Sequence, residues 1–242
     1  MISNNSLNLM DCIAGMAQLT EKSTDLVVAD PPYNVGGKSN HIISIEKKFS
    51  SIKEEWDTVS GCDFEEFNKR WINESYRILK DGGSLLCWGS RHNLYLCGHL
   101  IEKAGFTIRT EYVWYKTNAM PCITGRNPSE STEHLIWATK GKCWTYNLSY
   151  AKSINNGQNI RNIFTTIQTP QKERQHGKHP SQKRLEGLTD HLINLHSNPN
   201  DIIVVPFCGS GTECVAAAKS GRNYIAFELE EKYLEIAKKR LA

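Results

Sequence analysis

The sequence contains no run of 18 consecutive apolar residues, so it predicts no membrane-spanning helix. Its eight cysteines include no Cys-x-x-Cys pair, and Cys87, Cys97 and Cys214 lie in apolar stretches. This pattern argues against a zinc site or a disulfide framework and favours buried, reduced thiols without a metal site. Residues 1–8 are polar and do not resemble a signal peptide, so we expect a cytoplasmic protein.

No internal repeat or low-complexity tract interrupts the 242 residues, and this length suits one α/β domain with a modest insertion. The formal net charge of +3 is too small to indicate a nucleic-acid partner by itself. Clusters of basic residues are more informative than the total charge.

Short apolar runs alternate with amphipathic stretches along most of the chain. This alternation predicts a mostly parallel sheet with helices on both faces. Two long strands are expected at 106–116 and 134–139, separated by a loop at 117–132. We expect them to form an antiparallel hairpin at a sheet edge. The expected strands are 7–9, 26–29, 84–88, 106–116, 134–139, 201–205 and 224–227. The expected helices are 12–19, 64–79, 93–104, 185–195, 213–220 and 230–241.

Two further segments give no clean period. Residues 34–61 are rich in Gly, Ser, Asn and Lys and directly follow a candidate site, which is typical of a mobile binding loop. Residues 140–178 mix aromatic, amide and basic side chains. We expect this second segment to be a small insertion within a single domain, 1–242.

The first candidate site is Asp30-Pro31-Pro32-Tyr33, which follows the buried run at 26–29. Ligands of open α/β sheets bind beyond the carboxyl ends of the strands. At such an end this tetrapeptide places a carboxylate, a stiff backbone with free carbonyl groups, and an aromatic ring. These groups suit a planar molecule that carries an amino group.

The second candidate site is the turn Pro206–Thr212, which joins a predicted strand to a helix. Its glycines allow close approach of a ligand to the backbone, and it lacks the Gly-Lys-Ser/Thr of a P-loop. Glu228 ends the next strand, where an acidic side chain can bind both hydroxyls of a ribose. The spacing therefore favours a nucleoside-bearing cofactor.

With these two sites, nearly the whole chain resembles the DNA amino-methyltransferases. The resemblance is to the group in which the catalytic tetrapeptide precedes the glycine turn, a circularly permuted motif order. Besides the two sites and Glu228, it includes Asn8–Cys12, Arg77–Gly83, Trp114–Lys116, His179–Lys183, Tyr233 and Arg240-Leu241. It implies a Rossmann-like methyltransferase sheet of seven strands.

The resemblance implies S-adenosylmethionine as the cofactor. Asp11 and Cys12 would contact its adenine, Glu228 its ribose, and the glycine turn its methionine end, with Ser181 and Lys183 near the methionine carboxylate. The full set of expected cofactor-binding residues is Asp11, Cys12, Asp30, Ser181, Lys183, Phe207, Gly209, Ser210, Gly211, Thr212 and Glu228.

The implied catalytic residues are Asp30, Pro31, Pro32 and Tyr33. The target base would leave the duplex and stack on Tyr33. Its exocyclic amine would donate hydrogen bonds to the Asp30 carboxylate and the Pro31 carbonyl. In this family Asp-Pro-Pro-Tyr favours adenine N6, and cytosine N4 remains the alternative. Pro121-Cys122 is similar to the nucleophilic dipeptide of cytosine C5-methyltransferases, but the companion Glu-Asn-Val motif is missing.

The resemblance also implies DNA as the substrate, with a homodimer and a cognate restriction endonuclease as candidate partners. Basic side chains in predicted loops are the expected DNA contacts, and residues 140–178 the expected target-recognition insertion. The DNA-binding candidates are Lys47, Lys48, Arg126, Lys172, Arg174 and Lys178.

Two positions depart from the family pattern. Val205 stands where an aspartate usually precedes Pro-Phe, and Arg184 stands where proline usually follows the lysine. Because valine accepts no hydrogen bond, we expect weaker cofactor binding than in a typical member. A catalytically weakened DNA-binding relative is therefore a second hypothesis, and a methyltransferase of RNA or protein is a third.

Overall fold

The structure is a computed structural model that describes residues 2–33 and 61–242. The binding loop predicted at 34–61, up to residue 60, lies outside the described residues, and so do Lys47 and Lys48. None of the helices in the described part of the chain is long and apolar enough to cross a membrane.

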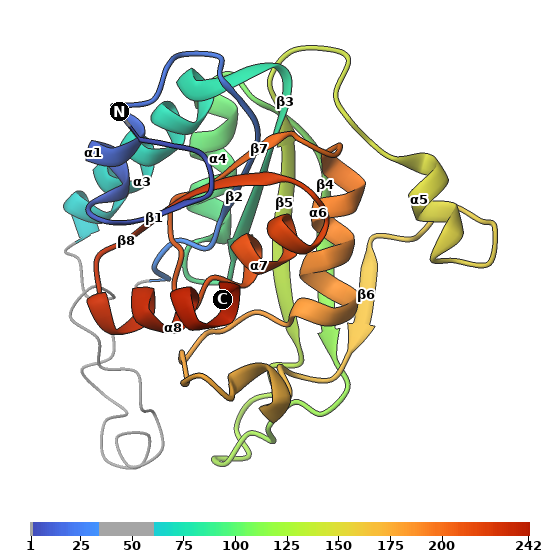
Figure 1. The fold of residues 1–242 in the computed structure, drawn as a ribbon. Coiled ribbons are helices and arrows are strands. Elements are labelled where there is room, and N and C mark those ends of the chain that lie inside the picture. The colour runs from blue at the N-terminus through green and yellow to red at the C-terminus, as the bar shows by residue number, and fades with distance from the viewer. Residues whose placement is uncertain (1, 34–60) are drawn as a thin grey trace.

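Within these residues eight strands form one sheet in the order β1-β8-β7-β2-β3-β5-β4-β6 (Figure 1). Strands β1, β8, β7, β2 and β3 run parallel, β5 is antiparallel to both β3 and β4, and β6 is parallel to β4. The strands are β1 (Ser6–Leu9), β2 (Thr24–Ala29), β3 (Leu79–Gly89), β4 (Thr107–Lys116), β5 (Thr132–Thr139), β6 (Ile163–Thr166), β7 (Ile202–Val205) and β8 (Asn223–Glu228).

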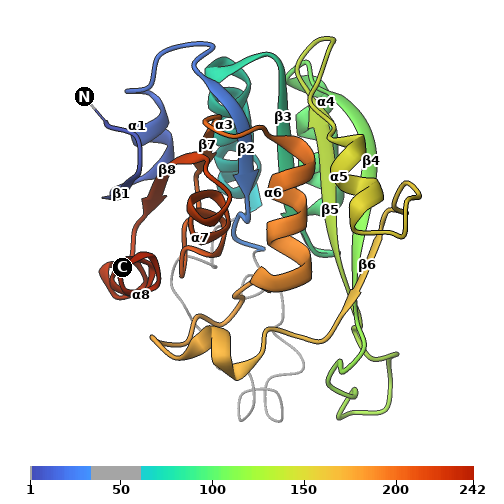
Figure 2. The ribbon, with the colours of Figure 1, turned by 45° about the vertical axis from the view of Figure 1, so that its right-hand side comes forward.

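Helices cover both faces of this sheet, as the alternation of elements predicted (Figure 2). They are α1 (Cys12–Met16), α3 (Gly61–Ile78), α4 (Leu94–Lys103), α5 (Leu148–Ser153), α6 (Asp190–His196), α7 (Thr212–Lys219) and α8 (Glu231–Leu241). A short 3-10 helix, η2 (Gln171–Arg174), and a π-helical segment interrupted at Glu186 and Gly187, η3 (Leu185–Thr189), precede α6.

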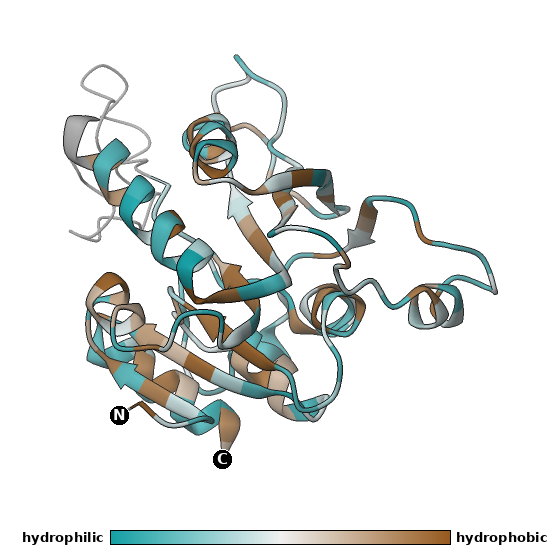
Figure 3. Ribbon diagram, turned by 90° about the horizontal axis from the view of Figure 1, so that it is seen from above, coloured by the Kyte–Doolittle hydropathy of each residue, from teal (hydrophilic) through white to brown (hydrophobic). Residues whose placement is uncertain are grey.

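The period of two along β2 divides the core into two layers. Leu26 and Val28 face one layer, which contains side chains of α6 and α7. Val27 and Ala29 face the other, which contains side chains of α1, α3 and α4. Figure 3 shows the consequence for α3, which is mostly hydrophilic along its outer side above the apolar strands. Burial on both faces explains why 26–29 reads as a continuous apolar run.

Three details differ from the predictions. The sheet has eight strands instead of seven, because the segment 140–178 contributes the short strand β6, which pairs with β4. The antiparallel pair β4–β5 is therefore not at the edge of the sheet. Strand β3 starts at Leu79, directly after α3, because Gly82 and Gly83 pair with Lys140 instead of forming a free turn. The helix predicted at 185–195 is broken at Gly187, whose φ is +76°.

The carboxyl ends of the parallel strands point toward the lower side of the molecule in Figure 1. The loop 117–131 and the segment 167–184 lie on this side in both views, whereas α5 projects from the flank (Figures 1 and 2). The topology therefore places β2, β7 and β8, with the two candidate sites that follow them, at one end of the sheet.

Candidate active site

A cavity of about 340 Å³ opens at the carboxyl ends of β2, β7 and β8. It brings together the two candidate sites, which are about 170 residues apart in the sequence. The residues expected from sequence that line it are Asp11, Cys12, Asp30, Pro31, Pro32, Tyr33, Ser181, Lys183, Phe207, Gly209, Ser210, Thr212 and Glu228. Gly211 does not line it.

Asp30 is the first residue beyond β2, and both of its carboxylate oxygens have partners. The Tyr33 hydroxyl donates to Oδ1 at 2.6 Å, and Lys183 Nζ donates to Oδ2 at 2.5 Å. Lys183 Nζ also lies 3.1 Å from the Tyr33 hydroxyl oxygen. Burial raises the pKa of Asp30, and the ammonium of Lys183 opposes this shift.

Lys183 is 2% exposed and contacts a second carboxylate, that of Glu133 on β5, at 3.3 Å. Lys116 at the end of β4 pairs with the other oxygen of Glu133 at 3.1 Å. Burial alone would lower the pKa of Lys183, but Asp30 and Glu133 outweigh it and raise that pKa. Burial would raise the pKa of Glu133, and the two lysines reverse this and lower it. These four residues form a chain of alternating charges from the cavity to the antiparallel strands.

The glycine turn uses its two glycines differently. Gly211 has a φ of +76°, and a Cβ there would lie 2.7 Å from the Cβ of Ala237 on α8, so this glycine is required for packing. Gly209 has a φ of +51° and donates its amide to Oε2 of Glu228 at 2.6 Å. Oε1 of Glu228 accepts from the amides of Leu229 and Glu230, both at 2.9 Å. The carboxylate is thereby fixed at the cavity wall.

An aromatic surface lies beside the turn. Phe207 contacts Trp71 edge-on with ring centroids 5.6 Å apart, and Phe67 with centroids 6.0 Å apart. Phe67 on α3 also lines the cavity and was not among the expected site residues.

Other residues that line the cavity were not among the expected catalytic or cofactor-binding residues, although Pro206 and Cys208 belong to the glycine turn itself. Most follow immediately after or before predicted ones, so the motifs themselves were the available signal. They are Met10, Phe67, His179, Pro180, Gln182, Pro206, Cys208, Glu213, Phe227, Leu229 and Tyr233. Among residues 2–33 and 61–242, no group of three His, Cys, Asp or Glu side chains is placed to bind a metal ion.

Comparison with known proteins agrees with this geometry. The family model described as DNA methylase (N6_N4_Mtase) matches residues 24–239. The chain belongs to this DNA methylase family. It is 38% identical over 237 residues to type II methyltransferase M2.LlaDCHI of Lactococcus lactis subsp. cremoris, covering 93% of this chain and 85% of that protein. It is 35% identical over 240 residues to type II methyltransferase M2.DpnII of Streptococcus pneumoniae, covering 96% and 87%.

Solved structures extend the likeness to the fold. The crystal structure of an M1.HpyAVI–SAM complex matches with a TM-score of 0.71 and 27% identity over 98% of both chains. PvuII DNA methyltransferase, described as cytosine-N4-specific, matches with a TM-score of 0.79 and 17% identity over all of this chain and 88% of that one. At that identity the second match concerns the fold alone. The predicted α/β methyltransferase fold is confirmed.

The DNA-binding candidates of this DNA methylase lie around the cavity end where the structure describes them. Arg126 is exposed in the loop 117–131, and Lys178 is exposed after η2. Lys172 is exposed and pairs with Glu186 at 2.6 Å, while Arg174 is half-buried.

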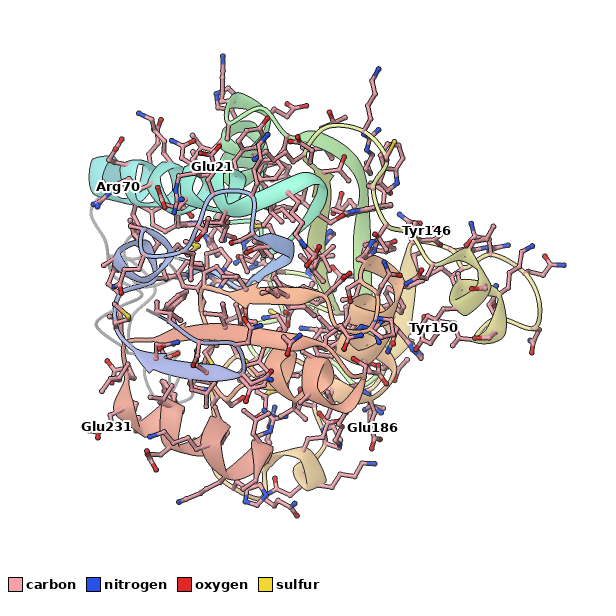
Figure 4. The ribbon with its side chains drawn as sticks, turned by 45° about the horizontal axis from the view of Figure 1, so that its top comes forward. Glu21, Arg70, Tyr146, Tyr150, Glu186 and Glu231 are labelled. Carbon is pink, nitrogen blue, oxygen red and sulfur yellow. The ribbon has the colours of Figure 1, made fainter. Side chains whose placement is uncertain are left out.

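The aromatic part of the predicted insertion lies elsewhere. Figure 4 shows Tyr150, which belongs to α5, and Tyr146, which precedes this helix, on the projecting flank of the molecule. Tyr146 stacks on Trp137 with centroids 5.7 Å apart, and Lys140 is buried with its Nζ donating to the carbonyl of Tyr76 at 2.6 Å. These contacts give residues at the start of 140–178 a role in packing. The recognition role of the segment stays a prediction.

Cys122, the candidate nucleophile of the rival chemistry, lies in the loop 117–131 and does not line the cavity. A hydrogen bond with Thr124 and nearby backbone amides lower the pKa of its thiol to about 7.

Proposed function

We propose that this protein transfers the methyl group of S-adenosylmethionine to the N6 amine of an adenine flipped out of DNA. The observation that carries the proposal is that Asp30-Pro31-Pro32-Tyr33 lines the same cavity as the glycine turn and Glu228. Methyl transfer needs its donor and acceptor sites side by side, and here both open into one cavity.

The cavity residues fit S-adenosylmethionine. Glu228 is fixed by three backbone amides, two on Oε1 and one on Oε2, so Oε2 keeps a lone pair that can accept from a ribose hydroxyl. Asp11 and Cys12, at the start of α1, and Phe207 supply polar and apolar surface for the adenine ring. When bound, the cofactor supplies an electrophilic methyl group.

Asp30 retains acceptor capacity for the target amine. A carboxylate has about four lone-pair sites, and Tyr33 and Lys183 use one on each oxygen. Among residues 2–33 and 61–242 no backbone amide donates to the Pro31 carbonyl, and Pro32 beside it has no N–H. Together the Asp30 carboxylate and the Pro31 carbonyl can accept hydrogen bonds from both N–H groups of an exocyclic amine. These bonds would direct the lone pair of the amine toward the methyl group. Orientation and charge stabilisation drive such a transfer, and no covalent adduct with the enzyme forms.

The first residue of the tetrapeptide supports adenine over cytosine. Asp30 provides a charged acceptor, whereas family members that act on cytosine N4 tend to have serine there. Cytosine N4 is the alternative target. Because Val205 is buried at the end of β7 and offers no hydrogen bond, a catalytically weakened DNA-binding relative is the second candidate function. The setting proposed is a cytoplasmic restriction-modification system, with a homodimer and a cognate endonuclease as partners.

Labelled methyl transfer to unmethylated DNA tests the proposal. After digestion of the DNA to nucleosides, we expect the label in N6-methyladenine. Label in N4-methylcytosine would support the alternative target, and no incorporation would support the weakened relative.

Asp30→Ala should lower the transfer rate about 100-fold or more, because preorganised groups at the reacting centre contribute on that scale. The matched control is Asp81→Ala. Asp81 is 69% exposed and pairs with Lys22, so its loss should leave the rate unchanged. Equal rates for Asp30→Ala and the wild type would contradict the assigned role.

A further inference from the structure

The cavity lacks the carboxylate that the family pattern places at the end of β7. Val205 occupies that position, is fully buried and does not line the cavity. Its backbone pairs with β8 opposite Ala226, so the side chain belongs to the core. The methionine end of the cofactor carries an ammonium group, and an ammonium group has three donors to satisfy.

A different acidic residue, Glu213, lines the same cavity. Glu213 lies in the first turn of α7, immediately after the glycine turn, and is 5% exposed. The sequence gives no sign of this, because a glutamate in the first turn of a helix usually faces water and complements the helix dipole. The short distance along the chain from Gly211 fixes its place beside the turn that is expected to bind the methionine end.

Three charged groups face Glu213, and none forms an ion pair with it among the described residues. Asp30 beyond β2 repels it, and Lys183 and Arg240 attract it from a distance. Lys183 is paired with Asp30 and Glu133. Arg240 on α8 donates to the Ser210 carbonyl and hydroxyl and to the Thr212 hydroxyl.

The Glu213 carboxylate is therefore buried without a cationic partner. Burial and the charge of Asp30 raise its pKa to about 7. A buried carboxylate in this state is costly when ionised, and a bound cation would remove much of the cost. A cavity that presents such a group suits a ligand with a positive charge.

We propose that Glu213 binds the ammonium group of the cofactor's methionine moiety, in place of the aspartate that is missing at position 205. This inference rests on the proposed use of S-adenosylmethionine. It gives the chain a carboxylate for this contact from α7 instead of β7. It also removes the reason to expect weak cofactor binding from Val205.

Glu213→Gln preserves the shape of the side chain and removes its charge. Three ligands separate the possible contacts in titration calorimetry: S-adenosylmethionine has a sulfonium and an ammonium, S-adenosylhomocysteine has only the ammonium, and methylthioadenosine has neither. We expect the variant to bind the first two about 10- to 100-fold more weakly, the scale of a hydrogen bond to a charged group. Methylthioadenosine should bind the variant and the wild type equally, which also shows that the variant is folded.

The pH dependence provides an independent readout. Below its pKa of about 7 Glu213 is mostly protonated in the free protein, so binding of the ammonium must release a proton. The affinity of the wild type for S-adenosylhomocysteine should therefore rise between pH 6.0 and 7.5, and the affinity of Glu213→Gln should stay flat. Methylthioadenosine lacks the ammonium group, so its affinity over the same pH range shows any pH dependence that comes from Asp30, Lys183 or Arg240 instead of Glu213.

The outcomes are distinguishable. If Glu213→Gln binds all three ligands as tightly as the wild type, the inference is wrong and the proposed function stands. A loss confined to S-adenosylmethionine would assign Glu213 to the sulfonium and overturn the ammonium contact. If the wild type binds none of the three, the proposed function itself fails. Glu231→Gln, in the first turn of α8 outside the cavity lining, is the matched control and should change nothing.

Discussion

At the scale of single residues, Lys183 is the most informative side chain of the site. From the sequence it was expected near the methionine carboxylate of the cofactor. The structure buries it between Asp30 and Glu133, with its Nζ 5.4 Å from the ring centroids of both Tyr33 and Trp88. One ammonium thus compensates two buried carboxylates and holds Asp30 in place in the lining of the cavity.

Lys183→Met should destabilise the protein by about 3 kcal/mol at pH 7, because removal of one partner leaves buried charges unpaired. The effect depends on pH with a definite sign. Lys183 and Lys116 hold the pKa of Glu133 below its unfolded value of about 4.3, so this stabilisation is complete above pH 4.3 and is lost on acidification through the folded pKa. Urea unfolding at pH 7 and at pH 4 measures the difference between variant and wild type, which should shrink at pH 4.

Lys172→Met is the control for Lys183→Met. Lys172 pairs with Glu186, but both side chains are more than half exposed, and an exposed pair contributes less than about 1 kcal/mol. An equal loss of stability in the two variants would show that the buried pairs at the cavity add nothing specific.

At the scale of elements, β6 is the feature that the sequence did not indicate. It has only four residues, and one of them, Phe164, is buried. The centroid of the Phe164 ring lies 5.7 Å from that of the Tyr112 ring on β4 and 6.3 Å from that of the His191 ring on α6. A strand this short is held by pairing with β4 and by one aromatic anchor, which explains why no periodicity marks it.

Phe164→Ala should lower the free energy of unfolding by about 3 kcal/mol, the usual cost of emptying a buried aromatic site. The neighbouring Ile163 is 53% exposed, so Ile163→Ala should cost less than about 1 kcal/mol. Denaturant titration of the two variants measures the contrast. A small effect for Phe164→Ala would mean that β6 does not depend on this anchor.

At the scale of the whole molecule, a net charge of only +3 gives no hint of a nucleic-acid partner. The arrangement of the charges is more informative than their sum. Segments with exposed Arg126, Lys172 and Lys178 lie at the carboxyl end of the sheet, the end where the cavity opens (Figure 2). This arrangement predicts that DNA lies across the two segments, 117–131 and 167–184.

Arg126→Ala and Lys178→Ala should each weaken DNA binding and reduce the slope of log affinity against log salt by about 1, the value for one lost phosphate contact. Fluorescence anisotropy with labelled DNA at several salt concentrations measures the slope. The control is Lys103→Ala, an exposed residue in the last turn of α4. Unchanged slopes for Arg126→Ala and Lys178→Ala would place the DNA elsewhere.

The sequence alone determined the order of elements and most of the cavity lining. Local signals were enough, because buried parallel strands are continuous apolar runs and turns at their ends have distinctive residues. The strands expected at 26–29 and 201–205, which correspond to β2 and β7, and the residues of both candidate sites illustrate this. In a segment without a hydrophobic period, such as 140–178, local signals could not predict a strand, and β6 was missed.

Only the tertiary structure decided which side chains neutralise one another. Glu133 lies on an antiparallel strand far from both motifs in the sequence, and it reaches the cavity because β5 pairs with β3 and β4. Glu213 resembles an ordinary first-turn glutamate until α7 packs its carboxylate against the cavity. Whether a charge is paired or left without a partner depends on burial and on groups distant in sequence, and these are fixed only when the chain has folded.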